Sequence, residues 1–367
     1  MVKKNKAIGE YDFLILIPTI ILLGIGLVAI YSSSSFLADH KLQDNYFYLK
    51  RQGFFVLMGL FLLIIAKNTP VELYRKLVYP ALIVSFLLLT MLFIPGFGKN
   101  VNGATRWLSI GGFTLQPSEF VKLSLAVYVA YSMSKKGNNM SSFSRGLLPH
   151  LLVFGVFMFM ILKQPDLGTT MILGCWLMIL LFVAGLNLFQ LVAMAIVACP
   201  IVIYLIYNEV YRLKRWFTFL NPWEDPHGLG FQIIHSFLAF GSGGILGVGL
   251  GNSKQKLLYL PEPHTDFILS ILAEELGLIG VIVIILLFSI LIIRGIKISL
   301  DAPDLYSSYL ALGISLMFGL QVIINMGVVM GLLPTKGLTL PLLSYGGSSL
   351  LVNLVGIGIL MNISARK

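Results

Sequence analysis

The chain has 367 residues, of which 57% are hydrophobic and only 11% are charged, and its mean hydropathy is +0.90. Soluble domains carry about 25% charged residues, so this composition excludes a soluble globular protein and indicates an integral membrane protein. The net charge of +10 comes from basic residues scattered through the loops, without a dense block, so no nucleic-acid partner is expected. Cys175 and Cys199 both fall in apolar runs and cannot build a disulfide framework.

Ten apolar runs predict membrane-spanning helices, because lipid offers an irregular backbone no hydrogen-bond partners. In chain order they cover about 13–31, 54–66, 77–94, 120–133, 147–162, 169–184, 188–207, 276–293, 306–333 and 346–363. We therefore expect an all-α polytopic membrane protein with about ten transmembrane helices in a single membrane domain, 1–367. Short segments on the side of the termini are richer in Lys and Arg, which predicts that both termini are cytoplasmic.

Two predicted outer loops stand out by their length, at about 95–118 and at 208–264. The second is a large extracytoplasmic loop between the seventh and eighth predicted helices. Loops of this size with mixed polar and aromatic content are usually functional, and both lie on the face opposite the termini. The glycine-rich stretch 241–251 does not fit a nucleotide-binding G-x-G-x-x-G motif, so it predicts close helix packing or a tight turn.

Few acidic residues lie in or beside the apolar runs. Glu119 and Lys122 are three positions apart, so they share a helix face and can form an ion pair. That pair is equally consistent with fixing a helix and with contacting a substrate. Asp166 follows Pro165 in a tight outer turn, where a helix cap or a pair with Lys163 is expected.

Asp266 is the strongest candidate for chemistry. It ends the segment Tyr-Leu-Pro-Glu-Pro-His-Thr-Asp at 259–266, where a polar loop enters an apolar stretch. An unpaired carboxylate deep in the membrane costs about 3 kcal/mol, so its presence at this boundary favours a functional acid or base over a helix N-cap. Glu274 and Glu275 follow, and the sequence is consistent with their lying either inside the membrane or in an outer approach segment.

Cations gather on the same predicted outer face. They are Arg106, Arg212, Lys214, Arg215, Lys254, Lys256 and Lys336. Arginine binds phosphate oxygens in a planar fork and lysine acts as a point charge, so the group suits a polyanion such as pyrophosphate. Nearby tryptophans either stack on sugar rings or anchor at the lipid interface. One base, several cations and access from lipid together predict a polyprenyl-pyrophosphate sugar donor.

Six ordered motifs resemble those of the SEDS family (shape, elongation, division and sporulation), to which FtsW, RodA and SpoVE belong. They are Gln-Pro-Ser-Glu at 116–119, Gln-Pro-Asp-Leu-Gly at 164–168, Asn-Pro-Trp-Glu-Asp-Pro at 221–226, Pro-Glu-Pro-His-Thr-Asp-Phe at 261–267, Ala-Glu-Glu-Leu-Gly at 273–277 and Leu-Pro-Leu-Leu-Ser-Tyr-Gly-Gly-Ser at 340–348. The segments 251–256 and 334–338 are more similar to the division and sporulation branch (FtsW, SpoVE) than to RodA.

The resemblance implies a peptidoglycan glycosyltransferase of the cytoplasmic membrane that polymerises lipid II on the outer face, for septal or spore wall synthesis. The transfer would be inverting, with undecaprenyl pyrophosphate as the leaving group. Expected partners are lipid II, undecaprenyl-pyrophosphate-linked glycan, a class B penicillin-binding protein and other division proteins. A lipid II flippase and a non-catalytic division scaffold are the alternative functions.

The family's proposed catalytic aspartate matches Asp266. Residues that the family treats as important match Trp107, Glu119, Lys122, the cluster Arg212, Lys214 and Arg215, and Lys336. The remaining cations and motif residues complete the expected substrate-binding set: Arg106, Lys256, Glu262, His264 and Ser344. Arg212 and Arg215, with either Lys336 or a divalent cation (Mg²⁺ or Mn²⁺), would stabilise the departing pyrophosphate. The sequence shows no dedicated set of metal ligands, so the ion stays open, and no organic cofactor is expected.

Overall fold

The computed structural model describes residues 11–366 apart from 102, 111–112, 257–259 and 262. Each of the ten predicted runs corresponds to one helix, although most of the bounds differ, which confirms the all-α polytopic fold. These helices are α1 (Phe13–Leu42), α2 (Phe47–Asn68), α4 (Val78–Met91), α5 (Pro117–Lys136), α6 (Leu148–Lys163), α7 (Leu167–Val183), α8 (Leu188–Tyr207), α11 (Ile268–Leu300), α12 (Leu305–Val329) and α13 (Gly347–Ser364). Within the described residues, seven helical segments are long and apolar enough to cross a membrane by themselves.

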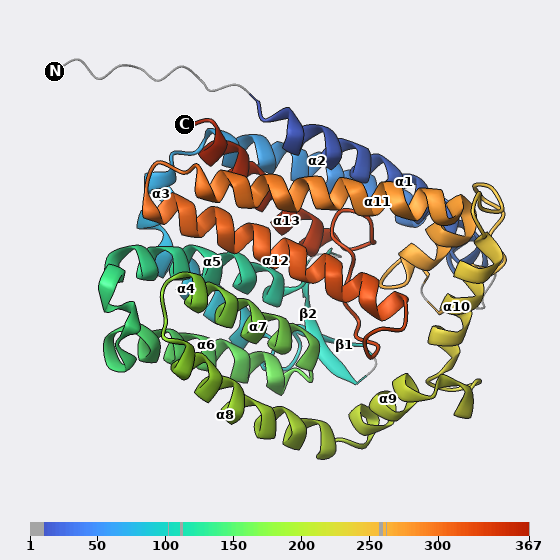
Figure 1. Cartoon of the computed structure of the whole chain (residues 1–367). Helices are drawn as coiled ribbons and strands as arrows, with labels where there is room; N and C mark the ends of the chain where they lie inside the picture. The colour runs from blue at the N-terminus through green and yellow to red at the C-terminus, as the bar shows by residue number, and fades with distance from the viewer. Residues whose placement is uncertain (1–10, 102, 111–112, 257–259, 262, 367) are drawn as a thin grey trace.

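The described chain begins and ends at the same end of the bundle (Figure 1). Ser364 at the end of α13 donates a hydrogen bond to Asp12 (2.6 Å), and Arg294 of α11 pairs with Asp12 (2.9 Å). Short elements close this end: α3 (Val71–Lys76), η1 (Gly137–Ser141) and η2 (Phe143–Leu147). Both ends of the described chain therefore lie at one end of the bundle.

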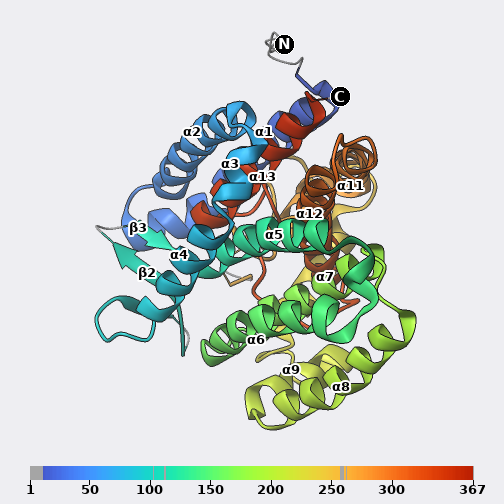
Figure 2. The same ribbon diagram turned by 90° about the vertical axis from the view of Figure 1, so that its left-hand side faces the viewer.

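The centre of the bundle is α12, which packs against α5, α7, α11 and α13. Figure 2 shows α5 and α12 in the middle, and both views place α8 at the margin. Only Leu191 of α8 is buried, so the other apolar side chains of this helix are available to lipid.

The opposite end carries the two long outer loops, and both contain regular structure. The first forms an antiparallel sheet, β1 (Gly98–Val101), β2 (Ala104–Ile110) and β3 (Phe113–Leu115), in that order. Trp107 of β2 is paired in register with Lys99 of β1. The second loop contains α9 (Val210–Leu220), η3 (Pro222–Glu224) and α10 (Phe231–Gly243). The sequence predicted only loops in both segments, without this regular structure.

A break in α11 explains the glycine-rich stretch. Gly277 has φ 65° and ψ −166°, so the normal helical hydrogen bonds cannot form across it. The segment 243–249 supplies replacement partners: Val248 N and Gly249 N donate to the Glu274 and Glu275 carbonyls (both 3.0 Å), while Leu278 N and Ile279 N donate to the Gly244 and Ile245 carbonyls (2.9 and 3.3 Å). The glycines thus allow close backbone packing, as predicted.

Glu274 and Glu275 lie in the outer part of α11, before this break, and both are buried within the protein. Glu275 accepts hydrogen bonds from Ser32 (2.5 Å) and Lys256 (3.2 Å). Glu274 accepts hydrogen bonds from the segment 253–255. The two carboxylates therefore hold the loop before Asp266 against α11 and α1, and they are not exposed to lipid.

Candidate active site

A cavity of about 230 Å³ opens at the end of the bundle opposite the termini. It lies between β2, the turn before α7, the end of α8, α9 and the loop after α12. Its charged lining residues are Arg106, Asp166, Arg212, Arg215 and Lys336. Four cations thus surround one carboxylate, and none of the four forms an ion pair with a described residue. This cationic cavity can bind a polyanion.

Helix α9 presents one face to the cationic cavity. Tyr211, Arg212, Arg215 and Trp216 line it, and their spacing of one and four residues places them on one side of the helix. Arg212 donates to the Leu205 carbonyl (2.8 Å), which fixes α9 to the end of α8. Lys214 is exposed and does not line the cavity, so the structure separates it from its two arginine neighbours.

Arg106 and Asp166 shape the turn that enters α7. Arg106 donates from Nε to the Gln164 carbonyl (3.2 Å) and from Nη2 to the Pro165 carbonyl. The Asp166 carboxylate accepts from Thr169 N (3.1 Å), so the predicted helix cap is confirmed. Trp107, the neighbour of Arg106, is half-buried on β2 and is not part of the cavity lining.

Lys336 enters the cationic cavity from the loop between α12 and α13. Its ammonium lies 3.4 Å from the Met171 sulfur. Burial lowers the pKa of Lys336, and the nearby Asp166 carboxylate offsets part of this effect. A bound anion would stabilise the charged form, so this lysine is poised to gain from anion binding.

Asp266 does not line the cationic cavity, but Asn325 links its backbone to that of a lining residue. The Asn325 side chain donates to the Asp266 carbonyl (3.0 Å) and to the carbonyl of Leu338, a cavity-lining residue (2.6 Å). The Asp266 carboxyl is half-buried and accepts from the Thr265 hydroxyl (2.8 Å). Helix α11 begins at Ile268 with Phe267 as its N-cap and no side-chain cap, so the N-cap interpretation of Asp266 is wrong.

His264 is buried two residues before Asp266. Its ring packs against Tyr48 (4.3 Å between centroids) and Tyr345 (5.5 Å), and its carbonyl accepts from Tyr345 N (2.8 Å). Burial lowers the pKa of His264 to about 4, with a smaller contribution from Lys41. The ring is therefore neutral near pH 7 and fixes the backbone that leads to Asp266.

We expect stability to depend on pH through His264. The unfolded imidazole has a pKa of about 6.5, so between pH 6.5 and 4 the unfolded chain binds more protons than the folded one. Acidification from pH 7 to 4 should cost about 3 kcal/mol through this group. The measurement is the unfolding midpoint against pH for wild type and His264→Phe, whose curve should be flatter. Parallel curves would contradict the assignment.

Three further expected site residues lie elsewhere or outside the described chain. Ser344 is buried and accepts a hydrogen bond from Leu340 N (2.8 Å) within a turn. Lys256 is buried against Glu275. Neither lines the cationic cavity. Glu262 lies outside the described residues.

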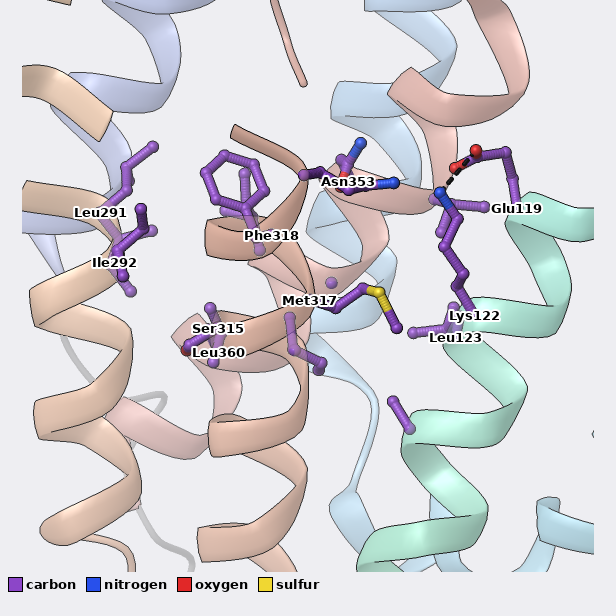
Figure 3. A pocket seen from close by; sticks show the side chains of 17 residues that line it. Glu119, Lys122, Leu123, Leu291, Ile292, Ser315, Met317, Phe318, Asn353 and Leu360 are labelled. Atoms are coloured by element: carbon purple, nitrogen blue, oxygen red, sulfur yellow. Dashed lines mark hydrogen bonds and ion pairs between the residues drawn. The ribbon is translucent and has the colours of Figure 1, made fainter. Parts of the chain in front are cut away.

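Glu119 and Lys122 form a buried ion pair (2.6 Å) inside the bundle. Figure 3 shows the pair on α5 at one end of a second pocket, with Leu291 and Ile292 of α11 at the other. This pocket is about 40 Å³, mainly apolar, and shares no lining residue with the cationic cavity. The structure thus does not bring the pair to the cations.

The ion pair offers a stability test. Glu119→Gln or Lys122→Met alone should each cost about 3–5 kcal/mol, because the remaining charge stays buried without a partner. The double variant should recover most of that loss, as measured by denaturant unfolding in detergent. A double variant that is stable but inactive would indicate a role in the reaction. A double variant less stable than both single variants would show that the two residues do not stabilise the fold by pairing with each other.

Among the described residues, no three His, Cys, Asp or Glu side chains cluster to hold a metal ion. Asp166 is already bonded to Thr169. The described residues therefore do not form a protein cage for Mg²⁺ or Mn²⁺.

Comparison with known proteins places this architecture in a family. A profile of the FtsW, RodA and SpoVE proteins, described as cell cycle proteins, matches residues 13–367. The chain is 47% identical over 361 residues to the Geobacter sulfurreducens protein named probable peptidoglycan glycosyltransferase FtsW, covering 98% of this chain and 97% of that protein. It is 46% identical over 354 residues to stage V sporulation protein E of Bacillus subtilis, covering 96% of each.

A solved structure supports the same assignment. A chain from a structure on the coordination of polymerization and crosslinking by a peptidoglycan synthase complex has a TM-score of 0.79 with this chain at 28% identity. The match covers 96% of this chain and 97% of the other. Matching sequence motifs, full-length identity and shared fold agree: the chain belongs to the FtsW/RodA/SpoVE family of cell cycle membrane proteins, within its division and sporulation branch.

Proposed function

We propose that this chain is a peptidoglycan glycosyltransferase that polymerises lipid II. The observation that carries the proposal is the cationic cavity, whose four cations form no ion pair with a described residue. Asn325 links the backbone of its lining, at Leu338, to the backbone of Asp266. Relatives at 46–47% identity carry names for glycan synthesis or sporulation. A diphosphate leaving group explains the cations, and a proton acceptor explains Asp266.

In the reaction we propose, Asp266 removes the proton from the 4-hydroxyl of an acceptor N-acetylglucosamine. That oxygen forms a bond to the anomeric carbon of the donor N-acetylmuramic acid, with inversion. The bond from this carbon to the diphosphate oxygen breaks, and undecaprenyl pyrophosphate leaves with the electron pair. Arg212, Arg215 and Lys336 stabilise its negative charge, and no second carboxylate is required because pyrophosphate leaves without a proton.

The proposed reaction also implies how the chain is oriented in the membrane. The cationic cavity would face the outside of the cytoplasmic membrane, and both termini would be cytoplasmic. The likeness to a chain from a peptidoglycan synthase complex supports a cross-linking partner, which we propose is a class B penicillin-binding protein at the septum or forespore, together with other division proteins. A divalent cation, Mg²⁺ or Mn²⁺, would arrive bound to phosphate oxygens.

Strand formation separates an enzyme from a transporter or scaffold. Purified protein with lipid II and its penicillin-binding partner should give glycan strands on a gel in detergent, where no membrane separates two compartments. Lipid II movement across sealed vesicles, without strands in detergent, would support the flippase and overturn the proposal. Neither strands nor movement would support the scaffold.

The cations give a further prediction. Arg215→Gln and Lys336→Met should each lower kcat/KM by about 10- to 100-fold, because a charge-assisted hydrogen bond contributes about 1.5–3 kcal/mol. Lys214→Met is the matched control on the same helix, since Lys214 lies outside the cationic cavity, and it should remain near wild type. Equal losses in all three variants would show a general effect of outer-face charge instead.

A further inference from the structure

Asn325 connects the two halves of the proposed site. It is buried on α12, the central helix, and its one amide nitrogen donates to two backbone carbonyls. One carbonyl belongs to Asp266 (3.0 Å), and the other to Leu338 (2.6 Å). Leu338 lies two residues after Lys336 in the loop between α12 and α13, and both residues line the cationic cavity. A single side chain therefore ties the backbone of the proposed base to the loop that carries Lys336, a proposed diphosphate ligand.

Other contacts hold the segment that leads to Asp266. The segment 264–266 is held by Tyr345 N at the His264 carbonyl (2.8 Å) and by the packing of the His264 ring. Helix α11 begins two residues after Asp266 and has no side-chain cap. Asn325 ties the Asp266 carbonyl to α12 and to the loop that carries Lys336.

The side-chain amide of Asn325 lowers the stability of the fold through its oxygen. Its Oδ1 atom is buried and has no hydrogen-bond partner among the described residues. An unsatisfied buried acceptor costs about 1–3 kcal/mol, so this side chain does not optimise stability alone. Its two donated hydrogen bonds explain an asparagine at this position better than stability does, because both go to backbone of the proposed site.

We propose that Asn325 is a positioning residue that sets the distance between Asp266 and the loop bearing Lys336. The proposal rests on the proposed function, since it assigns Asn325 a role only through these two groups. A displacement of about 1 Å can cost about 10²-fold in rate when the reacting groups must be aligned. Asn325 would therefore govern kcat more than donor binding, which the other cations maintain.

Asn362 is a matched control for the test. It is buried on α13, and its amide also donates to two backbone carbonyls, those of Lys67 and Thr69 (2.7 Å to Thr69). These contacts lie at the end of the bundle that carries the termini, far from the cationic cavity. Asn362→Leu therefore removes the same kind of interaction without touching the proposed site.

The experiment compares Asn325→Leu, Asn325→Asp and Asn362→Leu with wild type in strand formation from lipid II, with unfolding midpoints measured in parallel. We expect Asn325→Leu to lower kcat by about 10- to 100-fold with KM within about twofold. Asn325→Asp, which keeps the shape and at most one donor, should fall between it and wild type. Asn362→Leu should lose stability but keep its kcat.

Two results would overturn the proposal: folded Asn325 variants with wild-type kcat, or Asn325 variants that fail to fold while Asn362→Leu folds. The second result would make Asn325 a stability residue only. The Asp266→Asn variant distinguishes failure of the proposed function. If Asp266→Asn is inactive and Asn325→Leu is fully active, only the positioning role fails. If Asp266→Asn is active, the proposed base itself fails.

Discussion

Asp266→Asn should lower the rate of glycan strand formation by about 10²- to 10⁴-fold while lipid II binding stays near wild type. Asparagine keeps the size and the hydrogen-bonding shape of the side chain but cannot accept the proton of the attacking hydroxyl. The backbone of residue 266 would remain held by Asn325, so the change is confined to the carboxyl. The loss should therefore appear in kcat.

The measurement is the initial rate of strand formation with lipid II binding followed on the same preparations. Asp44→Asn is the control, because Asp44 is also on the outer face and pairs with Lys50 in an exposed position (2.9 Å). It should retain wild-type rates. An Asp266→Asn variant that forms strands as fast as wild type would remove this residue from the mechanism.

Gly277→Ala should prevent stable folding of the outer half of α11. Gly277 has a positive φ of 65°, and a Cβ atom there would lie 2.3 Å from the Gly247 nitrogen. That neighbour is backbone that takes part in the exchange of hydrogen bonds between α11 and the segment 243–249. Neither side can move without breaking several of these bonds, so we expect a loss of several kcal/mol.

Gly251→Ala separates backbone strain from steric overlap. Gly251 also has a positive φ (83°), but a Cβ atom there would meet nothing within 4 Å. It should lower the unfolding midpoint only slightly, whereas Gly277→Ala should give little folded protein by size-exclusion chromatography. If Gly277→Ala folds as well as Gly251→Ala, the break in α11 tolerates a side chain and is not tightly packed.

The helices could be predicted from the sequence because lipid imposes one simple rule, a long apolar run with internally bonded backbone. The sheet β1–β3 was not predicted, since its strands are short and lie in a segment rich in turn residues. The position of Glu274 and Glu275 was open for a different reason. It depends on backbone hydrogen bonds between α11 and a segment about thirty residues earlier in the chain. The pattern of apolar and polar residues within α11 does not reveal such bonds.

The candidate site was predicted in part. Asp266 and the cations stood out by charge beside apolar sequence, and the structure brings Arg106, Arg212, Arg215 and Lys336 to one cavity. A shared motif does not show which of its residues contact substrate and which hold the backbone. Ser344 and His264 were therefore grouped with the site, although the structure shows them in backbone and packing contacts. Asn325 was missed, because an asparagine in an apolar helix carries no charge signal.

A structure of the Asp266→Asn variant with bound lipid II tests the central claim most directly. We expect the diphosphate to lie among Arg212, Arg215 and Lys336, with residue 266 facing an acceptor hydroxyl that is placed for attack on the anomeric carbon. A diphosphate bound away from these side chains, or residue 266 turned from the sugar into packed hydrocarbon, would contradict it.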